Sequence, residues 1–192
     1  MLPTLLQASR EYPVVTLTGP RQSGRTTLCK MAFPDKPYVN LEAPDIRQFA
    51  QSDPRGFLAT LPEGAILDEI QRTPDIPSYL QEIVDKNPAV GQFILTGSRQ
   101  FELKDQLSQS LAGRTALLRL LPLSIRELRN AGKVPSLFSL MHSGFYPRII
   151  QNNLNPSQAL GEYCANSVLF MICRNLNALC ACVPAELVRC LT

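Results

Sequence analysis

The sequence has little of what several large classes of protein require. Its single histidine, His142, stands without a second histidine or clustered acids, so we expect a structural role and not a metal ligand or general base. No uninterrupted apolar run approaches the ~20 residues that span a bilayer. The N-terminus also lacks the basic region and the long apolar run of a signal peptide. We therefore expect a cytoplasmic protein that does not cross a membrane.

An excess of one charge is also missing. The 19 lysines and arginines and the 16 acidic residues leave a net charge of +3 over 192 residues, and the arginines are scattered. Dedicated nucleic-acid binders usually concentrate basic residues on one face, so the composition argues against that class. The sequence has no internal repeat and no low-complexity segment, and its length suits one core with a small appendage.

What the chain does contain is a glycine-rich loop between a strand-like and a helix-like segment. The β-branched segment Val14–Thr18 precedes the loop, and residues 28–32 can continue as a helix. The loop consists of Gly19, Pro20, Arg21, Gln22, Ser23, Gly24, Arg25, Thr26 and Thr27. It matches the phosphate-binding pattern G-x-x-x-x-G-K-[ST], except that Arg25 occupies the lysine position.

The chemistry of such a loop is anion binding. Its successive backbone N–H groups form a nest, and the following helix adds its N-terminal N–H groups. We therefore expect residues 19–27 to bind the phosphates of ATP, with the Thr26 hydroxyl directed to Mg²⁺. Arg25 keeps the positive charge but is longer, planar and forked, so nucleotide can bind while hydrolysis is impaired. The loop alone is equally compatible with a plain glycine-rich turn.

A second signal is the short apolar segment Ala65–Glu69, which ends in two acids, Asp68 and Glu69. In P-loop ATPases an aspartate at this place holds Mg²⁺, and the adjacent glutamate deprotonates the attacking water. A surface Asp-Glu pair is the plain alternative, but the combination with the glycine loop favours a nucleotide site. We predict Thr26 and Asp68 as metal ligands and Glu69 as the catalytic base.

A third strand-like segment, residues 92–96, leads into Gly97 and Ser98. A polar side chain at this strand end can lie between the acids and the γ-phosphate, and Thr96 and Ser98 are the candidates. Taken alone, an ordinary Gly-Ser turn is the better interpretation.

Six segments in order resemble the AAA-like P-loop ATPases of a large prokaryotic family that carries a second, nuclease-like C-terminal domain. They are residues 19–24, 38–42, 66–72, 93–98, 110–114 and 121–124. The resemblance covers about residues 1–160 and implies an ATP-binding AAA-type core. It also implies that Arg114 is a candidate γ-phosphate contact, in its own subunit or in a neighbour. A surface arginine after a glycine turn is the equal alternative, and Arg21 and Arg99 have weaker claims.

Helix-like and strand-like segments alternate along the chain, which predicts an α/β fold. We expect a P-loop NTPase three-layer sandwich with a mostly parallel five-stranded sheet, followed by a short helical tail. The expected strands are residues 13–18, 37–42, 65–69, 92–96 and 115–121. The nucleotide should lie at the carboxyl ends of the strands. We expect an ATP-binding domain over residues 1–130 and a helical extension over residues 131–160.

The composition changes at about residue 161. Five of the six cysteines lie in residues 161–192, and this segment contains no lysine or aspartate. Zinc-site spacing and histidine partners are missing from it, and a disulfide framework would require an oxidising compartment. We interpret the segment as a truncated or out-of-frame remnant of a second domain; in-frame coding of these residues in close relatives would contradict this.

The expected function is ATP binding, with Mg²⁺-dependent hydrolysis impaired by Arg25. The first alternative is a non-catalytic nucleotide-gated module, whose conformation a protein partner or a second copy of the chain reads. The second is a degraded product without activity.

Overall fold

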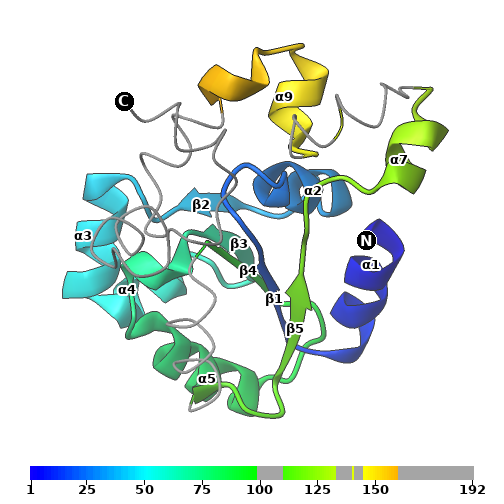
Figure 1. The fold of residues 1–192 in the computed structure, drawn as a ribbon. Coiled ribbons are helices and arrows are strands. Elements are labelled where there is room, and N and C mark those ends of the chain that lie inside the picture. Colours follow the sequence, from blue (N-terminus) through cyan, green and yellow to red (C-terminus); the bar gives the residue numbers. More distant parts are fainter. Residues whose placement is uncertain (99–109, 133–139, 141–144, 160–192) are drawn as a thin grey trace, which may run out of the picture. The chain divides into compact units, whose positions relative to one another are not determined.

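The structure of this chain is a computed structural model that describes residues 1–98, 110–132, 140 and 145–159 (Figure 1). Its contacts divide the chain into two units, Met1–Leu121 and Pro122–Thr192. The sheet and all the predicted site residues belong to the first unit. The expected domain boundaries at residues 130 and 160 stay predictions.

Some sequence predictions lie outside the described residues. They concern His142, Arg99, part of the helical extension expected over residues 131–160, and the cysteine-rich segment 161–192.

The first unit is built on a parallel sheet of five strands. The strands are β1 (Val14–Thr18), β2 (Tyr38–Asn40), β3 (Ala65–Asp68), β4 (Phe93–Gly97) and β5 (Thr115–Arg119). Their order is β2-β3-β4-β1-β5, and every neighbouring pair is parallel, which confirms the predicted sheet. Because parallel strands end at the same edge, the residues that follow β1, β3 and β4 meet there.

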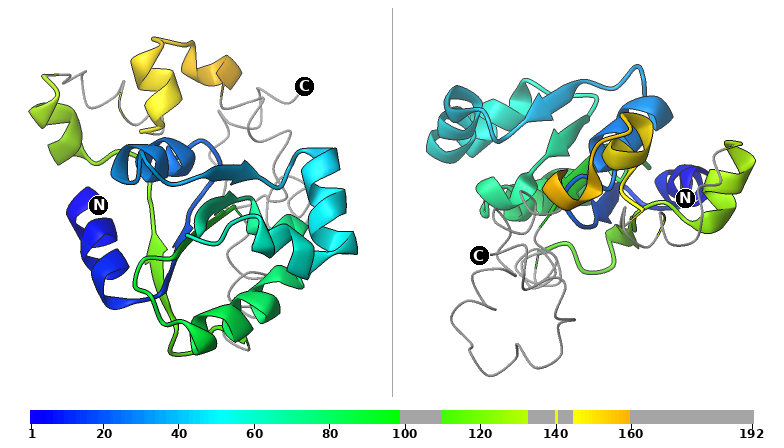
Figure 2. Two further views of the ribbon diagram at one scale, coloured as in Figure 1. Left: turned by 180° about the vertical axis from the view of Figure 1, so that it is seen from behind. Right: turned by 45° about the horizontal axis from the view of Figure 1, so that its top comes forward.

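Helices cover both faces of this sheet, so the predicted three-layer sandwich is confirmed (Figures 1 and 2). The helices are α1 (Leu2–Glu11) and α2 (Arg25–Ala32) on one face, and α3 (Pro44–Ser52), α4 (Pro54–Ala59) and α5 (Ile76–Lys86) on the other. Successive side chains of β1 point to opposite faces of the sheet, so β1 contributes to both helical layers. Val14 packs with α3–α5, whereas Val15 and Leu17 pack with α1 and α2. All five residues of β1 are buried, as expected for a central parallel strand.

Cys29 of α2 is fully buried in the apolar cluster beneath α1 and α2. Burial, with a smaller contribution from the Asp68 carboxylate, raises the pKa of the Cys29 thiol from 9.0 to about 12. Between pH 9.0 and about pH 12, the Cys29 thiol is ionised in the unfolded chain but protonated in the folded chain. Ionisation stabilises the unfolded chain, so the unfolding free energy falls as the pH rises above 9.0.

This thiol gives a pH prediction. From about pH 9 to pH 11, the unfolding free energy of the wild type should fall relative to that of Cys29→Ala by up to ~1.4 kcal/mol per pH unit. Urea unfolding at several pH values measures the difference. Parallel pH dependences of the two proteins would contradict the buried, protonated thiol.

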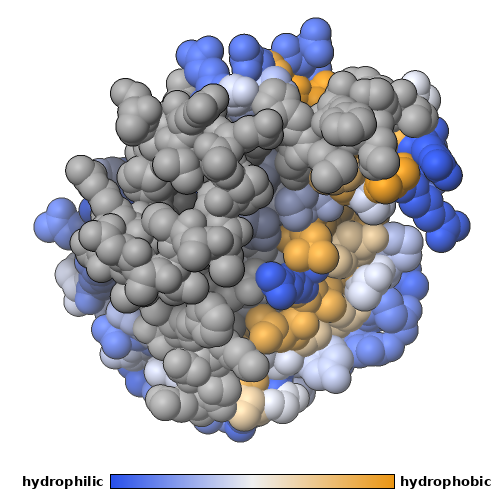
Figure 3. Space-filling view, viewed as in Figure 1, coloured by the Kyte–Doolittle hydropathy of each residue, from blue (hydrophilic) through white to orange (hydrophobic). Residues whose placement is uncertain are grey.

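The edge strand β5 is less covered than the centre of the sheet. The side chain of Leu117 in β5 is 47% exposed. Figure 3 shows apolar surface, drawn orange, where this strand runs in Figure 1. The strand ends at Arg119, two residues before the predicted end at residue 121.

The described part of the second unit is helical, as predicted for the residues after the sheet. Its helices include α7 (Ile125–Asn130) and α9 (Pro147–Gln151). A capping box opens α7: the Ser124 N–H donates to Glu127 Oε2 at 2.8 Å, and the Glu127 N–H donates to Ser124 Oγ at 3.2 Å. The N–H and the hydroxyl of Ser124 both donate to the Glu127 carboxylate, and these two bonds hold the pKa of Glu127 below its usual range. Within the described residues, no helix combines the length and the apolar character that a membrane span needs.

Candidate functional site

The loop after β1 has a backbone that only glycine fits at two points. A Cβ on Gly19 would lie 2.2 Å from the backbone oxygen of Leu120, which is too close for any side chain. Gly24 is the N-cap of α2 and has φ 89°, in the left-handed region that favours glycine. The fold therefore requires glycine at position 19 and favours it at position 24, and the loop leads directly into a helix N-terminus.

Two buried polar atoms of the loop lack a hydrogen-bond partner among the described residues. They are Ser23 Oγ and Arg25 Nη1, in side chains that are 4% and 7% exposed respectively. A buried polar group without a partner is costly and rare. At the start of α2, where backbone N–H groups and the helix dipole favour an anion, both atoms suit the oxygens of a phosphate.

The remaining predicted loop residues lie nearer the surface. Arg21, Gln22 and Thr27 are exposed, and Pro20 is partly buried. Gln22 has φ 61°, a left-handed conformation in the middle of the loop. Their predicted role rests on the loop backbone and stays a prediction.

Asp68, at the end of β3, accepts hydrogen bonds from three hydroxyl groups. Thr26 Oγ1 donates to Asp68 Oδ2 at 2.8 Å, and the Tyr38 hydroxyl donates to the same oxygen at 2.7 Å. Thr96 Oγ1 donates to Asp68 Oδ1. These groups come from α2, β2 and β4, and they surround a carboxylate whose residue is only 6% exposed. The structure thus brings together Thr26 and Asp68, the two predicted metal ligands.

Tyr38 was not predicted as a site residue. Burial and the hydrogen bond to Asp68 raise the pKa of Tyr38, so its hydroxyl remains a donor at neutral pH. Lys30 Nζ lies 3.5 Å from the centre of the Tyr38 ring. A tyrosine in a strand belongs to no motif; only the pairing of β2 with β3, which aligns Asn40 with Asp68, could have indicated it.

Glu69 follows β3 in a left-handed conformation, with φ 58° and ψ 46°. This conformation costs a non-glycine residue about 1–3 kcal/mol and persists only where the surroundings hold it. Glu69 caps η1 (Ile70–Arg72), and its carboxylate accepts hydrogen bonds from Ser98 Oγ at 3.3 Å and from Gln71 Nε2. Ser98 therefore contacts Glu69, whereas Thr96 contacts Asp68, so the two candidates at the end of β4 reach different acids.

Arg25, at the lysine position of the loop, is paired with the predicted base. Arg25 Nη2 lies 3.4 Å from Glu69 Oε1, and the two side chains are 7% and 19% exposed. A forked guanidinium can hold a carboxylate through one nitrogen and keep a second nitrogen for another acceptor. The positive charge expected to bind phosphate and the negative charge expected to activate water thus neutralise each other.

Arg114 lies at the amino ends of the strands, whereas the glycine loop lies at their carboxyl ends. It immediately precedes β5, and its backbone oxygen accepts from the N–H of Val14 at the start of β1, whereas the glycine loop follows the end of β1. Its guanidinium forms a two-pronged pair with Asp85, in which Nε and Nη2 donate at 2.5 and 2.9 Å. The structure does not bring Arg114 to the loop of its own chain; a contact with a neighbouring subunit stays a prediction.

The residues present suit Mg²⁺ and a triphosphate. In the part of the chain that the structure describes, no group of three or more histidine, cysteine or acidic residues is arranged to hold a metal by itself. Mg²⁺ does not require such a group, because it usually takes one or two carboxylates together with phosphate oxygens and water. The hydroxyl of Thr26 and the carboxylate of Asp68, beside the unpaired donors of the loop, fit that set.

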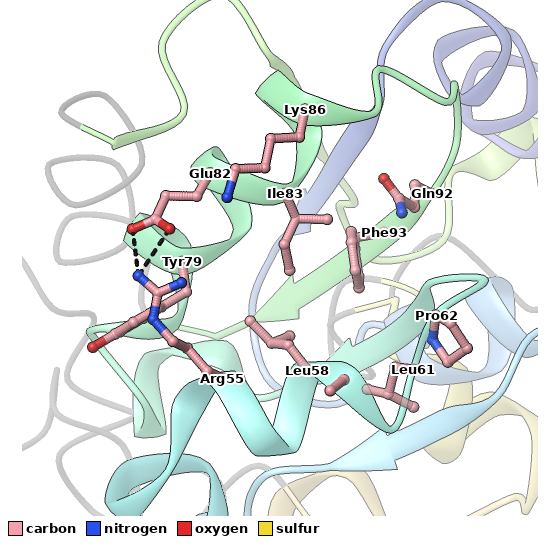
Figure 4. Close-up of a pocket in the computed structure, with 11 residues that line it drawn as sticks. Arg55, Leu58, Leu61, Pro62, Tyr79, Glu82, Ile83, Lys86, Gln92 and Phe93 are labelled. Atoms are coloured by element: carbon pink, nitrogen blue, oxygen red, sulfur yellow. Dashed lines mark hydrogen bonds and ion pairs between the residues drawn. The ribbon is translucent and has the colours of Figure 1, made fainter.

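A separate pocket of about 300 Å³ opens between α4 and α5 (Figure 4). Leu58, Ile83 and Phe93 line it, and the ion pair between Arg55 and Glu82, at 2.9 Å, lies at its side. Because Phe93 is the first residue of β4, the pocket lies at the amino edge of the sheet. It is distinct from the loop site, which lies at the carboxyl edge.

The parallel sheet, the glycine loop that opens a helix, and the acids at a neighbouring strand end define an AAA-type P-loop ATPase-like domain. Residues 11–129 match the family described as AAA domain, and the chain belongs to this family.

Solved structures share the fold. The Walker-type ATPase paby2304 of Pyrococcus abyssi aligns with a TM-score of 0.55 and 15% identity, over 92% of this chain and 74% of that chain. AMPPCP-bound DnaA from Aquifex aeolicus aligns with a TM-score of 0.53 and 16% identity, over 79% of this chain and 57% of that chain. At these identities the likeness establishes the P-loop fold.

Two mycobacterial proteins are similar in sequence. The uncharacterized proteins Rv2008c of Mycobacterium tuberculosis and Mb2031c of Mycobacterium bovis are each 35% identical over 125 residues. The match spans 65% of this chain but only 28% of each relative.

Proposed function

We propose that the first unit, Met1–Leu121, binds Mg-ATP and hydrolyses it slowly. The observation that carries the proposal is the 2.8 Å contact between Thr26 Oγ1 and Asp68 Oδ2, which joins the glycine loop to the acidic end of β3. A glycine-rich turn without function has no reason to direct its threonine at a buried carboxylate on another strand. The structurally similar DnaA binds AMPPCP, which supports nucleotide binding by this fold.

Each part of the site has a role in the proposal. The backbone N–H groups of residues 19–27, with Ser23 Oγ and Arg25 Nη1, bind the phosphates. Thr26 and Asp68 would hold Mg²⁺, which would supply positive charge to stabilise the triphosphate. Tyr38 and Thr96 fix the Asp68 carboxylate through their hydroxyl groups.

Hydrolysis depends on Glu69 as the general base, with Ser98 beside it. The Arg25–Glu69 pair makes this step slow, because Arg25 must release Glu69 Oε1 before Glu69 can accept a proton there. The same pair favours a second candidate function, a module that binds ATP without hydrolysis and signals occupancy to a partner. Arg114 contributes only if a neighbouring subunit presents it, as the resemblance implies.

Three further expectations from the sequence remain proposals. They are the nuclease-like C-terminal domain implied by the resemblance, the remnant origin of residues 161–192, and the cytoplasmic location. The family match over residues 11–129 concerns the AAA domain alone.

Replacing Arg25 with the lysine of the phosphate-binding pattern tests the proposal. Saturating Mg-ATP, at 100 times its Kd, should stabilise the wild type and Arg25→Lys alike, by about 2.7 kcal/mol. Turnover should rise by about 10-fold or more in Arg25→Lys, since lysine is a compact point charge and does not bridge to Glu69 with a fork. Thermal unfolding with and without Mg-ATP, together with phosphate release, measures both effects.

The outcomes separate the candidates. Stabilisation without phosphate release in either protein would favour the non-catalytic module. Absence of stabilisation in both proteins, while both remain folded, would contradict nucleotide binding at the loop.

A further inference from the structure

Gln71 contacts Glu69 in a way that regular helix geometry does not provide. Side chains two residues apart on a helix do not face each other. Glu69 is an exception because its backbone is left-handed and precedes η1, and its Oε2 accepts from Gln71 Nε2. Only the nitrogen of an amide can face a carboxylate, so this contact fixes the orientation of the Gln71 side chain.

The same amide nitrogen connects Glu69 to β4. Gln71 Nε2 donates to Ser98 Oγ at 3.2 Å, and Ser98 Oγ donates to Glu69 Oε2 at 3.3 Å. The three side chains form a closed set of hydrogen bonds around Oε2, while Arg25 contacts the other oxygen, Oε1. The carboxylate is thus fixed at one oxygen by neutral donors and paired at the other with a charge.

The contact is made at a cost in stability. Gln71 Oε1 is buried and has no hydrogen-bond partner among the described residues. A buried carbonyl oxygen left unpaired costs about 1–3 kcal/mol. Glu69 beside it is in a strained backbone conformation. Two unfavourable local features in side chains that contact each other indicate a functional constraint.

We propose that Gln71 is a positioning residue for Glu69, a role that rests on the proposed ATPase function. Gln71 and Ser98 hold Oε2, so that Oε1 is the oxygen that accepts the proton of the attacking water. Arg25 competes with that proton for Oε1, which explains why the release of Arg25 and the fixing of Oε2 must both precede turnover.

The test compares substitutions at Gln71 with one at Gln51 in the full chain. Gln51 Nε2 donates to the Arg72 carbonyl oxygen at 3.0 Å, so Gln51→Ala disturbs η1 without touching Glu69. Steady-state hydrolysis gives kcat, calorimetry gives the Kd of Mg-ATP, and thermal unfolding confirms the fold of each variant. Gln71→Ala should lower kcat about 10-fold or more and leave Kd within about 2-fold, because binding does not use the base. Gln51→Ala should change neither.

A second variant adds a readout that a structural role would not move. Gln71→Glu keeps the size of the side chain but replaces the amide nitrogen that donates to Glu69 Oε2 with a carboxylate oxygen, which cannot donate. Its kcat should fall at least as far as that of Gln71→Ala, whereas the Kd of Mg-ATP should stay within about 2-fold of the wild-type value. A kcat equal to that of the wild type would contradict the contact.

The remaining outcomes separate this role from the proposed function. Equal loss of kcat in Gln71→Ala and Gln51→Ala, or unchanged kcat in Gln71→Ala, would overturn the role and leave the function standing. Failure of the wild type to bind Mg-ATP would overturn both. If turnover of the wild type is below detection, the variants are compared in the Arg25→Lys background. If Gln71→Ala leaves kcat unchanged in the Arg25→Lys background, or if that background shows no turnover, the positioning role of Gln71 is overturned.

Discussion

Replacing Glu69 with glutamine is expected to stop ATP turnover while Mg-ATP still binds. General-base catalysis contributes typically about 10²–10⁴-fold, so kcat should fall by that amount. Glutamine keeps the length of the side chain but cannot accept the proton of water. Phosphate release measures the loss, and calorimetry with Mg-ATP verifies that binding remains.

The same substitution has a consequence for stability because of Arg25. Without Glu69 the buried guanidinium loses its charged partner, so the protein without nucleotide should lose about 1–3 kcal/mol of unfolding free energy. Mg-ATP should then stabilise Glu69→Gln more than the wild type, since the triphosphate supplies a new partner and no existing pair must break. Glu82→Gln, which removes the exposed pair with Arg55, is the matched control and should show neither effect. Equal stabilisation of Glu69→Gln and the wild type by Mg-ATP would contradict the competition for Arg25.

Asp68→Asn is expected to weaken the binding of Mg-ATP strongly. The amide places an N–H₂ group where hydroxyl donors now meet a carboxylate, and it removes the charge that would hold Mg²⁺. Affinity for Mg-ATP should fall about 100-fold or more, whereas the weaker binding of ATP in the presence of a chelator should change little. Thermal unfolding in Mg-ATP and in ATP with chelator measures the difference.

The control for this prediction is Asp45→Asn, at an exposed position in α3. It should bind as the wild type does. Unchanged Mg-ATP affinity in Asp68→Asn would mean that the carboxylate does not serve the metal.

The sheet was predictable because its determinants are local. Val14–Thr18 and Ala65–Asp68 are apolar strands with glycine or proline turns beside them, and the parallel arrangement follows from the alternation with helices. The convergence of Thr26 and Asp68 was predictable too, since both follow from motifs at the carboxyl ends of strands.

Other contacts could not be predicted, because they depend on how distant or unusual backbone segments are placed. The Tyr38–Asp68 bond depends on the register of β2 against β3. The Glu69–Gln71 contact depends on a left-handed residue that no local pattern announces. The position of Arg114, by contrast, could have been predicted, because the strand expected from residue 115 places Arg114 at its amino end, away from the carboxyl ends where the nucleotide was expected.

The proposed ATPase site requires that the loop over residues 19–27 and Asp68 together bind a magnesium triphosphate. Titration calorimetry of the folded wild-type chain with Mg-ATP measures this binding. We expect saturable binding to a single class of sites, and its loss in Gly19→Val, whose side chain would meet the Leu120 carbonyl. No heat of binding from the folded wild type, or undiminished binding by a folded Gly19→Val, would contradict it.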